Sequence, residues 1–544
     1  MSGHNSDNST DSEKLDDRPK GIDDAEQGVQ ENGKEYPEGV KLGLIILALC
    51  LAVFLMALDN SIITTAIPRI TDQFNSLDDV GWYGSAYLLT TAAFQLLFGK
   101  LYTYFNIKRL FLISIGIFEL GSVVCGAAPN STALIIGRAV AGLGSSGIFS
   151  GALLILGHSV PLVKRPAYIG VIGGMYGIAS IAGPLLGGAF TDKVSWRWCF
   201  WVNLPVGAVT IFVIIFFFQS PNQLDIPKDE TLLERINHFD PIGTFFFMPA
   251  IISLLLALQW GGTKYEWDSG RIIGLLVVFG ILIMAFIYVQ YRQKDNGTIP
   301  PRIAANRSIW AGCWFGFCSG ATFFLMVYYI PLWFQAVQGT SAVVSGVRNL
   351  PMLITTIILS IISGGLVTKL GYYTPFMIAS SVIMSIGAGM ISTWKPDSSS
   401  RVWIGYQILF SLGYGMGSRQ PLVAVQTVLD VKDVATGSSA IILVQTLGGT
   451  IFVSIAQSIF TNQLVKSLHQ LVPSLDPATV LSAGATDLRR VVSAEMLPGV
   501  ILAYNTALTR AFLASAALSA VSVMGALAMP WMSVKKSKAE GKEE

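Results

Sequence analysis

The sequence predicts an all-helical, polytopic membrane protein with fourteen transmembrane helices. The 544-residue chain is 52% hydrophobic and only 13% charged, which is far from the usage of soluble domains. Its apolar residues gather into fourteen runs, and a run of about 20 such residues can cross a bilayer as a helix. Lysine and arginine are distributed unequally between the connections of these runs, as expected for a protein with a fixed orientation in the membrane.

The predicted spans follow one another along almost the whole chain. They lie at 42–67, 80–99, 110–128, 132–157, 166–190, 199–219, 241–260, 271–291, 309–334, 346–368, 374–394, 402–428, 434–460 and 503–529. An even number of spans places both termini on one side. The tails and connections of that side hold 22 of the 36 Lys and Arg residues, and the opposite connections hold 10. Both termini are therefore predicted to be cytosolic.

An internal repeat divides the spans into two sets. The stretch GKLYTYFNIKRLFL from Gly99 aligns with GGLVTKLGYYTPFM from Gly364. Each copy follows the second helix of its set, and the 265 residues between them fit six helices plus an inserted pair. This spacing predicts a 6 + 2 + 6 arrangement. Its parts are a disordered acidic cytosolic tail (1–41), a six-helix bundle (42–219), an inserted helix pair with linkers (220–308), a second six-helix bundle (309–530) with an outer loop (461–502), and a charged cytosolic tail (531–544).

Composition and motifs exclude several classes of function. The formal charge of +2 without a dominant basic face argues against a nucleic-acid partner. All five cysteines lie in apolar runs, which predicts neither disulfides nor a zinc site. No catalytic triad, phosphate-binding loop or metal cluster stands at matched depth, so we expect no enzyme activity, no cofactor and no metal. A monomer is expected.

The fifth predicted span contains the stretch GVIGGMYGIASIAGPLLGG. Small residues recur there at fourfold spacing, which flattens one helix face and lets a neighbouring backbone approach closely. Pro184 removes a helix donor and favours a kink. We expect a tight, bendable contact that involves Gly170, Gly183, Pro184, Gly187 and Gly188.

This stretch resembles the antiporter motif of major facilitator superfamily exporters, although Ala179 stands where that motif has glycine. Further segments resemble the fourteen-span drug:proton antiporter branch, particularly its fungal toxin and multidrug efflux pumps. They are Leu58–Ile70 (LDNSIITTAIPRI), Gly137–Gly147 (GRAVAGLGSSG), Ser195–Gly207 (SWRWCFWVNLPVG) and Tyr328–Pro351 (YYIPLWFQAVQGTSAVVSGVRNLP). The resemblance implies a facilitator fold of two bundles that rock around a central cavity, driven by the proton gradient.

The two repeat copies resemble the cytosolic G-x-L-x-D-R-x-G-R motif, which braces the bundles of that superfamily. Threonine replaces its aspartate in both copies, so the charged lock is not carried over in its usual form. The predicted gate residues are Gly99, Thr103, Lys108, Arg109, Gly364, Thr368, Lys369 and Gly371. For Lys108 and Arg109, plain positive-inside topology is the competing interpretation.

Ionisable residues inside spans cost about 2.5–3.5 kcal/mol on insertion scales, so each is a functional candidate. Asp59 and Arg138 lie roughly 7 Å and 10 Å outward of the middles of their spans, at depths that allow contact. Glu119 lies near the middle of its span. Apolar burial favours the neutral form of a carboxyl group and a nearby arginine favours the charged form, so these three residues are the predicted proton-coupling set. The alternatives are hydrogen bonding of Asp59 near Ser61 and Thr64, and a structural role for Glu119.

Polar and aromatic residues in the spans provide candidates for a substrate cavity. They are Gln335, Gln426, Gln445, Phe94, Trp310, Phe315, Phe323 and Arg419. Aromatic side chains that face lipid give the same signal, and interfacial snorkelling is the alternative for Arg419.

The predicted function is export of small amphipathic organic compounds, such as a drug, toxin or secondary metabolite, in exchange for protons. The alternatives are proton-coupled uptake or vacuolar transport of a nutrient, siderophore or basic amino acid, and, from another class, a membrane receptor with a facilitator body. The expected partners are the substrate and the lipid bilayer. The plasma membrane is the expected location, with a vacuolar or vesicular membrane as the alternative.

Overall fold

The computed structural model describes residues 36–74, 76, 79–220, 240–262, 264–477, 479–481, 488–489 and 491–535. The predicted acidic tail lies outside the described residues up to position 35, and so does the charged tail from position 536. The described chain is helical, and its only β-pairings are isolated bridges. All-helical architecture is therefore confirmed for this part of the chain.

The first group of helices is called here the N-terminal bundle. It contains α1 (Gly39–Phe74), α2 (Val80–Tyr104), α3 (Ile107–Gly126), α4 (Ser131–Ser159), α5 (Arg165–Lys193), α6 (Trp198–Trp201) and α7 (Asn203–Phe217). Asparagine side chains cap two of these helices: Asn106 accepts from the Arg109 backbone and Asn130 from the Ala133 backbone. α4 packs against α2 and α3, and α1 packs against α5 and α7, so residues of α1, α3, α4 and α7 can share one interior.

The second group is called the C-terminal bundle. It contains α12 (Arg307–Ala336), α13 (Ala342–Arg348), α14 (Leu350–Leu370), α15 (Thr374–Ile391), α16 (Ser400–Gly417), α17 (Gln420–Val428), α18 (Val431–Leu471) and α20 (Leu497–Ala528). α12 packs against α18 and α20, and α16 packs against α14 and α15. The two bundles meet where α5 packs on α14 and where α2 packs on α18.

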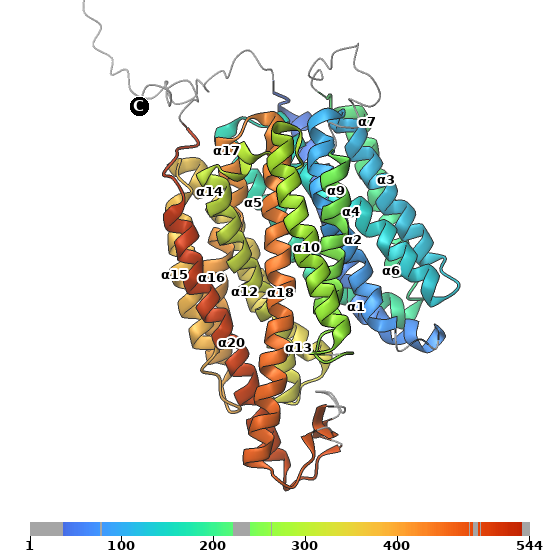
Figure 1. Ribbon diagram of the computed structural model, residues 1–544, viewed down its shortest axis with the longest axis vertical. Helices are drawn as coiled ribbons and strands as arrows, with labels where there is room; N and C mark the ends of the chain where they lie inside the picture. The colour runs from blue at the N-terminus through green and yellow to red at the C-terminus, as the bar shows by residue number, and fades with distance from the viewer. Residues whose placement is uncertain are drawn as a thin grey trace, which may run out of the picture. The chain divides into compact units, whose positions relative to one another are not determined.

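Two further helices, α9 (Pro241–Trp260) and α10 (Gly270–Gln293), form a pair beside this contact (Figure 1). α9 contacts α2 and α18, whereas α10 contacts mainly α9 and keeps most of its apolar surface exposed. Asp240 fastens the pair. Its buried carboxylate accepts hydrogen bonds from the Gly243 backbone, from Gln290 of α10 and from Thr298 in the connection to α12.

A helix lies at each of the fourteen predicted spans. Among the described residues, twelve helices are long and apolar enough to cross a membrane. The other two predicted spans, at α2 and at α16 with α17, contain polar residues such as Gln95 and Arg419. The structure therefore describes a polytopic membrane protein, and the count of fourteen stays a prediction.

The helix boundaries differ most around the predicted outer loop 461–502. α18 continues to Leu471 and α20 begins at Leu497, so the irregular connection is shorter than predicted. Proline explains both ends. Pro473 disfavours helical backbone at the residue before it, and Pro498 sits in the first turn of α20, where no intrahelical donor is required.

The start of α1 and the end of α20 lie at the same end of the molecule (Figure 1). We call it the tail end. The segment after α20 is attached there to the connection between α14 and α15, because Val534 N donates to Gly371 O at 2.8 Å and Thr374 Oγ1 donates to Pro530 O at 2.9 Å.

The small residues of α5 allow close packing against two neighbouring helices, α14 and α1. Towards the tail end, a Cβ at Gly170 would lie 2.5 Å from Ser360 O of α14. Towards the other end, a Cβ at Gly187 would lie 2.6 Å from Ile62 O of α1, and one at Gly183 would lie 2.8 Å from Ser61 Cβ. The predicted close packing is thus present. It links α5 to α1 within its own bundle and to α14 of the C-terminal bundle. Gly188 differs, because a Cβ there meets no heavy atom within 4 Å.

Gly187→Ala is expected to destabilise the protein, whereas the adjacent Gly188→Ala is not. The alanine methyl at 187 forces α1 and α5 apart, which costs about 1–3 kcal/mol. The same methyl at 188 meets open space and gains up to about 1 kcal/mol of helix propensity. Thermal unfolding of the purified protein in detergent measures the difference. Equal unfolding temperatures for both variants would contradict the α1–α5 packing described here.

Candidate functional site

A buried ion pair connects α1 and α4 in the N-terminal bundle. The Arg138 guanidinium contacts the Asp59 carboxylate through Nη1 and Oδ2, and both side chains are 0% exposed. Arg138 also donates from Nε to Tyr83 O at 2.8 Å. An isolated charge at this depth would be strongly disfavoured, whereas a paired and hydrogen-bonded one is tolerated. The structure thus brings together two of the three residues predicted for proton coupling.

α7 and α2 complete the surroundings of this pair. Asn203 Nδ2 lies 3.1 Å from Asp59 Oδ1 and donates to it, and the Arg138 guanidinium lies 4.5 Å from the centroid of the Tyr87 ring. The Tyr87 hydroxyl donates to Ser145 Oγ at 2.7 Å. Sequence reasoning did not select Asn203 or Tyr87 as site residues, although an asparagine inside an apolar run was an available signal for the first.

Glu119 lies on α3 beside this network. Its carboxyl group is pressed against α7 at Gly207, where a Cβ would lie 2.6 Å from Glu119 Cδ. Both carboxyl oxygens are buried and have no hydrogen-bond partner among the described residues. Asn203 and Gly207 are four residues apart on one face of α7, so the same helix face meets both acidic residues.

The alternative to a proton-coupling role was that Asp59 forms hydrogen bonds at its helix near Ser61 and Thr64. In the structure these hydroxyls bond to the backbone instead. Ser61 Oγ donates to Leu58 O and to Ala179 O of α5, and Thr64 Oγ1 donates to Ser61 O. The Asp59 carboxylate faces Arg138 and Asn203.

A second cluster lies between the bundles. It consists of Phe149 and Tyr176 from the N-terminal bundle and Phe323, Tyr414 and Arg419 from the C-terminal bundle; we call it the interbundle cluster. The rings of Phe323 and Tyr414 stack with centroids 4.1 Å apart. Arg419 Nη2 donates across the interface to Gly173 O of α5 at 3.3 Å. Gln445 lies next to Tyr414.

The other predicted cavity residues are dispersed. Gln426 donates to Leu153 O across the interface at 3.4 Å, and Gln335 donates to Ser345 Oγ within the C-terminal bundle. Phe315 is fully buried inside that bundle, and Trp310 is 49% exposed. Phe94 is partly buried against the core. Only Phe323, Arg419 and Gln445 of the predicted set are close to the interbundle cluster.

The two repeat copies occupy matching places at the tail end. Gly99 of α2 lies against α18, where Thr436 Oγ1 donates to Gly99 O at 3.5 Å and Thr103 Oγ1 donates to Lys432 O at 3.3 Å. Gly364 of α14 lies against the start of α5, where a Cβ would be 3.1 Å from Pro166 C. Each copy therefore presses one bundle against the other.

The remaining predicted gate residues act within their own bundles or lie at the surface. Lys108 donates to Ile215 O and Phe218 O at the end of α7, Arg109 is exposed, and the Thr368 hydroxyl has no partner among the described residues. Gly371, at φ +92°, ends α14 in the left-handed conformation that favours glycine. Lys369 O accepts from Lys535 Nζ.

The connection between α10 and α12 supplies charged contacts at the same end. It contains η4 (Lys294–Asn296) and α11 (Pro301–Ala304). Arg302 forms a two-bond ion pair with Asp433 at the start of α18, at 2.6 and 2.9 Å. Lys100 of α2 donates to Gly297 O at 2.7 Å and to Asp295 O at 3.2 Å. One connection thus holds both α2 and α18, and we call it the linker brace. Hydrogen bonds to Asp433 raise the pKa of Arg302 above its ordinary value, so Arg302 keeps its charge.

Comparison with known proteins identifies the family. The profile described as Major Facilitator Superfamily matches residues 49–453. The chain belongs to the major facilitator superfamily. The MFS-type efflux pump MFS1 of Trichophyton rubrum is 57% identical over 502 residues, covering 92% of this chain and 94% of the relative. Efflux pump roqT of Penicillium rubens is 55% identical over 492 residues, covering 90% and 91%.

A third relative, the Aspyridones efflux protein of Neocamarosporium betae, is 52% identical over 505 residues and covers 93% of this chain and 90% of its own. Solved facilitators share the fold. The proton:xylose symporter XylE aligns with a TM-score of 0.58 at 13% identity, covering 92% of this chain and 99% of XylE. The human organic anion transporter MFSD10 aligns with a TM-score of 0.57 at 13% identity, covering 89% and 100%.

These findings establish a membrane transporter of the facilitator fold and indicate a protein that is not an enzyme. The relatives themselves are named as efflux pumps or efflux proteins. The structure of this facilitator has its bundles in contact at the tail end, through α2 with α18 and α5 with α14. Ser150 and Ser439 continue the contact deeper between the bundles, with their hydroxyls 2.8 Å apart.

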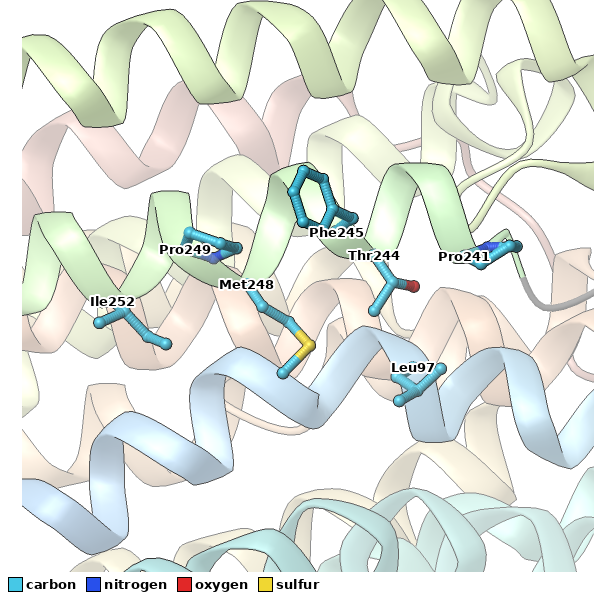
Figure 2. A pocket seen from close by; sticks show the side chains of 7 residues that line it. All are labelled: Leu97, Pro241, Thr244, Phe245, Met248, Pro249 and Ile252. Carbon is cyan, nitrogen blue, oxygen red and sulfur yellow. The ribbon is translucent and has the colours of Figure 1, made fainter.

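A groove on the facilitator surface runs between α2 and α9 (Figure 2). Its volume is about 570 Å³. The lining is almost entirely apolar and comprises Leu97, Pro241, Thr244, Phe245, Met248, Pro249 and Ile252. Such a surface suits lipid chains, and it contains none of the charged residues of the two clusters.

Arg138→Gln alone is expected to destabilise this facilitator by about 3–5 kcal/mol, because it leaves the Asp59 carboxylate buried without its cation. The double variant Asp59→Asn/Arg138→Gln should recover much of that loss. Thermal unfolding of the wild type, both single variants and the double variant measures the coupling between the residues. Additive single-variant effects would contradict a direct pair.

Asp433→Asn is expected to loosen the tail-end contact, since it removes the buried partner of Arg302. Asp295→Asn removes its exposed partner and should have little effect, because exposed pairs contribute at most about 1 kcal/mol. The readout is maleimide labelling of Thr436→Cys in a background without the native cysteines. We expect a several-fold faster reaction for Asp433→Asn only. Equal labelling rates in all three proteins would show that the linker brace does not control closure.

Proposed function

We propose that this facilitator exports small amphipathic organic compounds in exchange for protons. The observation that carries the proposal is the buried Asp59–Arg138 pair, with the unpaired Glu119 carboxyl group close by. Carboxyl groups at intramembrane depth that can exchange between neutral and charged forms are the simplest means of carrying protons. The names of the relatives support the direction of transport, since they describe efflux.

The proposed topology has fourteen spans in a 6 + 2 + 6 arrangement with both termini cytosolic. α1 to α7 and α12 to α20 form the two six-span bundles, and α9 and α10 are the inserted pair. The tail end is then the cytosolic side, in agreement with the distribution of lysine and arginine. In this proposed orientation, the contact between the bundles at the tail end would close the cytosolic entrance.

The proposed coupling follows from the balance of charge around Arg138. While Asp59 is ionised, Arg138 and Asn203 satisfy it, and the pair holds α1, α4 and α7 together. A proton entering from the outer side would neutralise Asp59 and release Arg138 towards Tyr87, which already lies against the guanidinium. Among the residues that the structure describes, none donates a hydrogen bond to the Glu119 carboxyl group, which serves as a second acceptor for the proton. The small faces of α5 permit the accompanying shift between the bundles.

The proposed cargo is a drug, toxin or fungal secondary metabolite, by analogy with the relatives, one of which is named for the export of aspyridones. The protein acts as a monomer without a cofactor, and the plasma membrane is the proposed location. Uptake of a nutrient, siderophore or basic amino acid and a receptor role remain the competing functions, and the following experiment separates them.

The test uses purified protein in liposomes that carry a pH gradient, challenged with lipophilic cations, neutral aromatics and aromatic acids. We expect a compound-dependent collapse of the gradient with the wild type and a loss of at least about tenfold in rate for Asp59→Asn, since a neutral amide cannot carry the proton. Asp72→Asn, an exposed position on the same helix, is the control.

Each alternative outcome has a distinct meaning. Collapse of the pH gradient with both the wild type and Asp59→Asn is still consistent with antiport, but it assigns the proton site to Glu119. The variant Glu119→Gln then tests that assignment. Binding of a compound without any collapse overturns antiport and favours the receptor or a uniporter. Proton movement in the same direction as the compound favours uptake.

A further inference from the structure

The geometry points to the interbundle cluster as the part of the substrate site that selects planar aromatic acids, with Arg419 as the specificity-determining residue. This inference rests on the proposed export function and specifies its substrate class. The ligand chemistry is one or two aromatic rings carrying a carboxylate, phenolate or enolate group.

Arg419, which is partly buried, differs from Arg138 and Arg302 in its partners. Arg138 has Asp59 and Arg302 has Asp433, whereas Arg419 has no carboxylate within ion-pair distance among the described residues. Its recorded protein contacts are the single hydrogen bond to Gly173 O and the face of Phe149, 6.0 Å from the guanidinium carbon. A guanidinium offers five N–H donors, and within the described part of the chain only one hydrogen bond from Arg419 is found, to Gly173 O.

The position of Arg419 argues against snorkelling to the membrane surface. It stands between α16 and α17, and α17 continues for nine further residues towards the tail end, which is roughly 14 Å of helix. The side chain extends to α5 of the opposite bundle, since a Cβ at Gly173 would lie 3.0 Å from Arg419 Cδ. The charge is therefore placed at the interface between the bundles, where it is costly unless a ligand uses it.

Aromatic rings flank the guanidinium on both sides of that interface. Phe149 and Tyr176 pack edge to face with centroids 6.3 Å apart, and Phe323 lies parallel to Tyr414. Tyr176 and Tyr414 both lie within electrostatic reach of Arg419. Ring faces favour flat aromatic ligands, and a guanidinium binds a carboxylate through two parallel hydrogen bonds. A cationic ligand would meet an uncompensated positive charge instead.

The cluster also adjoins the proposed proton site. The Arg138 guanidinium lies over the face of the Tyr87 ring, and Tyr87 is near enough to Tyr176 for the two side chains to interact electrostatically. While the bundles are in contact at the tail end, Gly173 O accepts one hydrogen bond from the Arg419 guanidinium. This carbonyl competes with a bound anion and so favours its release on the outer side.

Binding of matched probes to the full-length protein in detergent tests the inference without requiring transport. The probes are 2-naphthoate and the neutral 2-naphthamide, which share the ring system and differ in charge. Isothermal titration should give at least about tenfold tighter binding of the naphthoate by the wild type, the difference expected for a hydrogen bond to a charged group. Arg419→Gln should reduce that preference to less than about threefold while retaining amide binding, and Arg419→Lys should fall between them.

Arg510→Gln removes an exposed arginine and should leave the preference unchanged. No preference in the wild type, no naphthoate binding at all, or an unchanged preference in Arg419→Gln would each overturn the inference. Retained amide binding and an unchanged unfolding temperature show that Arg419→Gln is folded. The liposome assay separates the two proposals: preferential binding without proton-coupled movement refutes antiport alone, and proton-coupled movement without charge preference refutes this inference alone.

Discussion

The N-terminal bundle depends on one electrostatic constraint, the fully buried ion pair of Asp59 and Arg138. Neither charge could remain there alone, because desolvation would cost more than the surrounding packing provides. The pair is held by α1 and α4, with a further donor from α7 and a ring face from α2. Four helices are thus positioned around one pair of charges.

α5 and the linker brace relate this bundle to its partner. α5 contacts α1 through one set of small residues and α14 through another, so movement of either neighbour is transmitted by backbone contact with little freedom for side chains to absorb it. At the tail end, hydroxyl groups of Thr103 and Thr436 replace the charged contacts that the usual facilitator motif provides. The ionic part of the contact lies instead in the connection between α10 and α12, where Arg302 and Lys100 reach Asp433 and the linker backbone.

The helices α9 and α10 therefore have a physical connection to the contact between α2 and α18 at the tail end. Asp240 ties α9 and α10 to the same connection that holds α2 and α18. Neighbouring side chains lead from the Asp59–Arg138 pair inside the N-terminal bundle, through Tyr87 and Tyr176, to Arg419 at the contact between the bundles. In the proposed mechanism, these neighbours would let proton binding, cargo binding and closure influence one another.

The sequence by itself determined the membrane class, the positions of the helices, the repeat and the family resemblance, because span length and the distribution of charge are local properties that the bilayer imposes on any chain. It also indicated Asp59 and Arg138 from their depths alone. Only the tertiary structure decided that Asn203 and Tyr87 complete their site, that Phe315 is buried within one bundle, and that Arg302 reaches Asp433. The Asn203–Asp59 and Arg302–Asp433 contacts join residues 131 or more positions apart. The places of Tyr87 and Phe315 depend on the rotation of a helix about its axis, which packing against neighbours fixes and a nearly uniform apolar run does not encode.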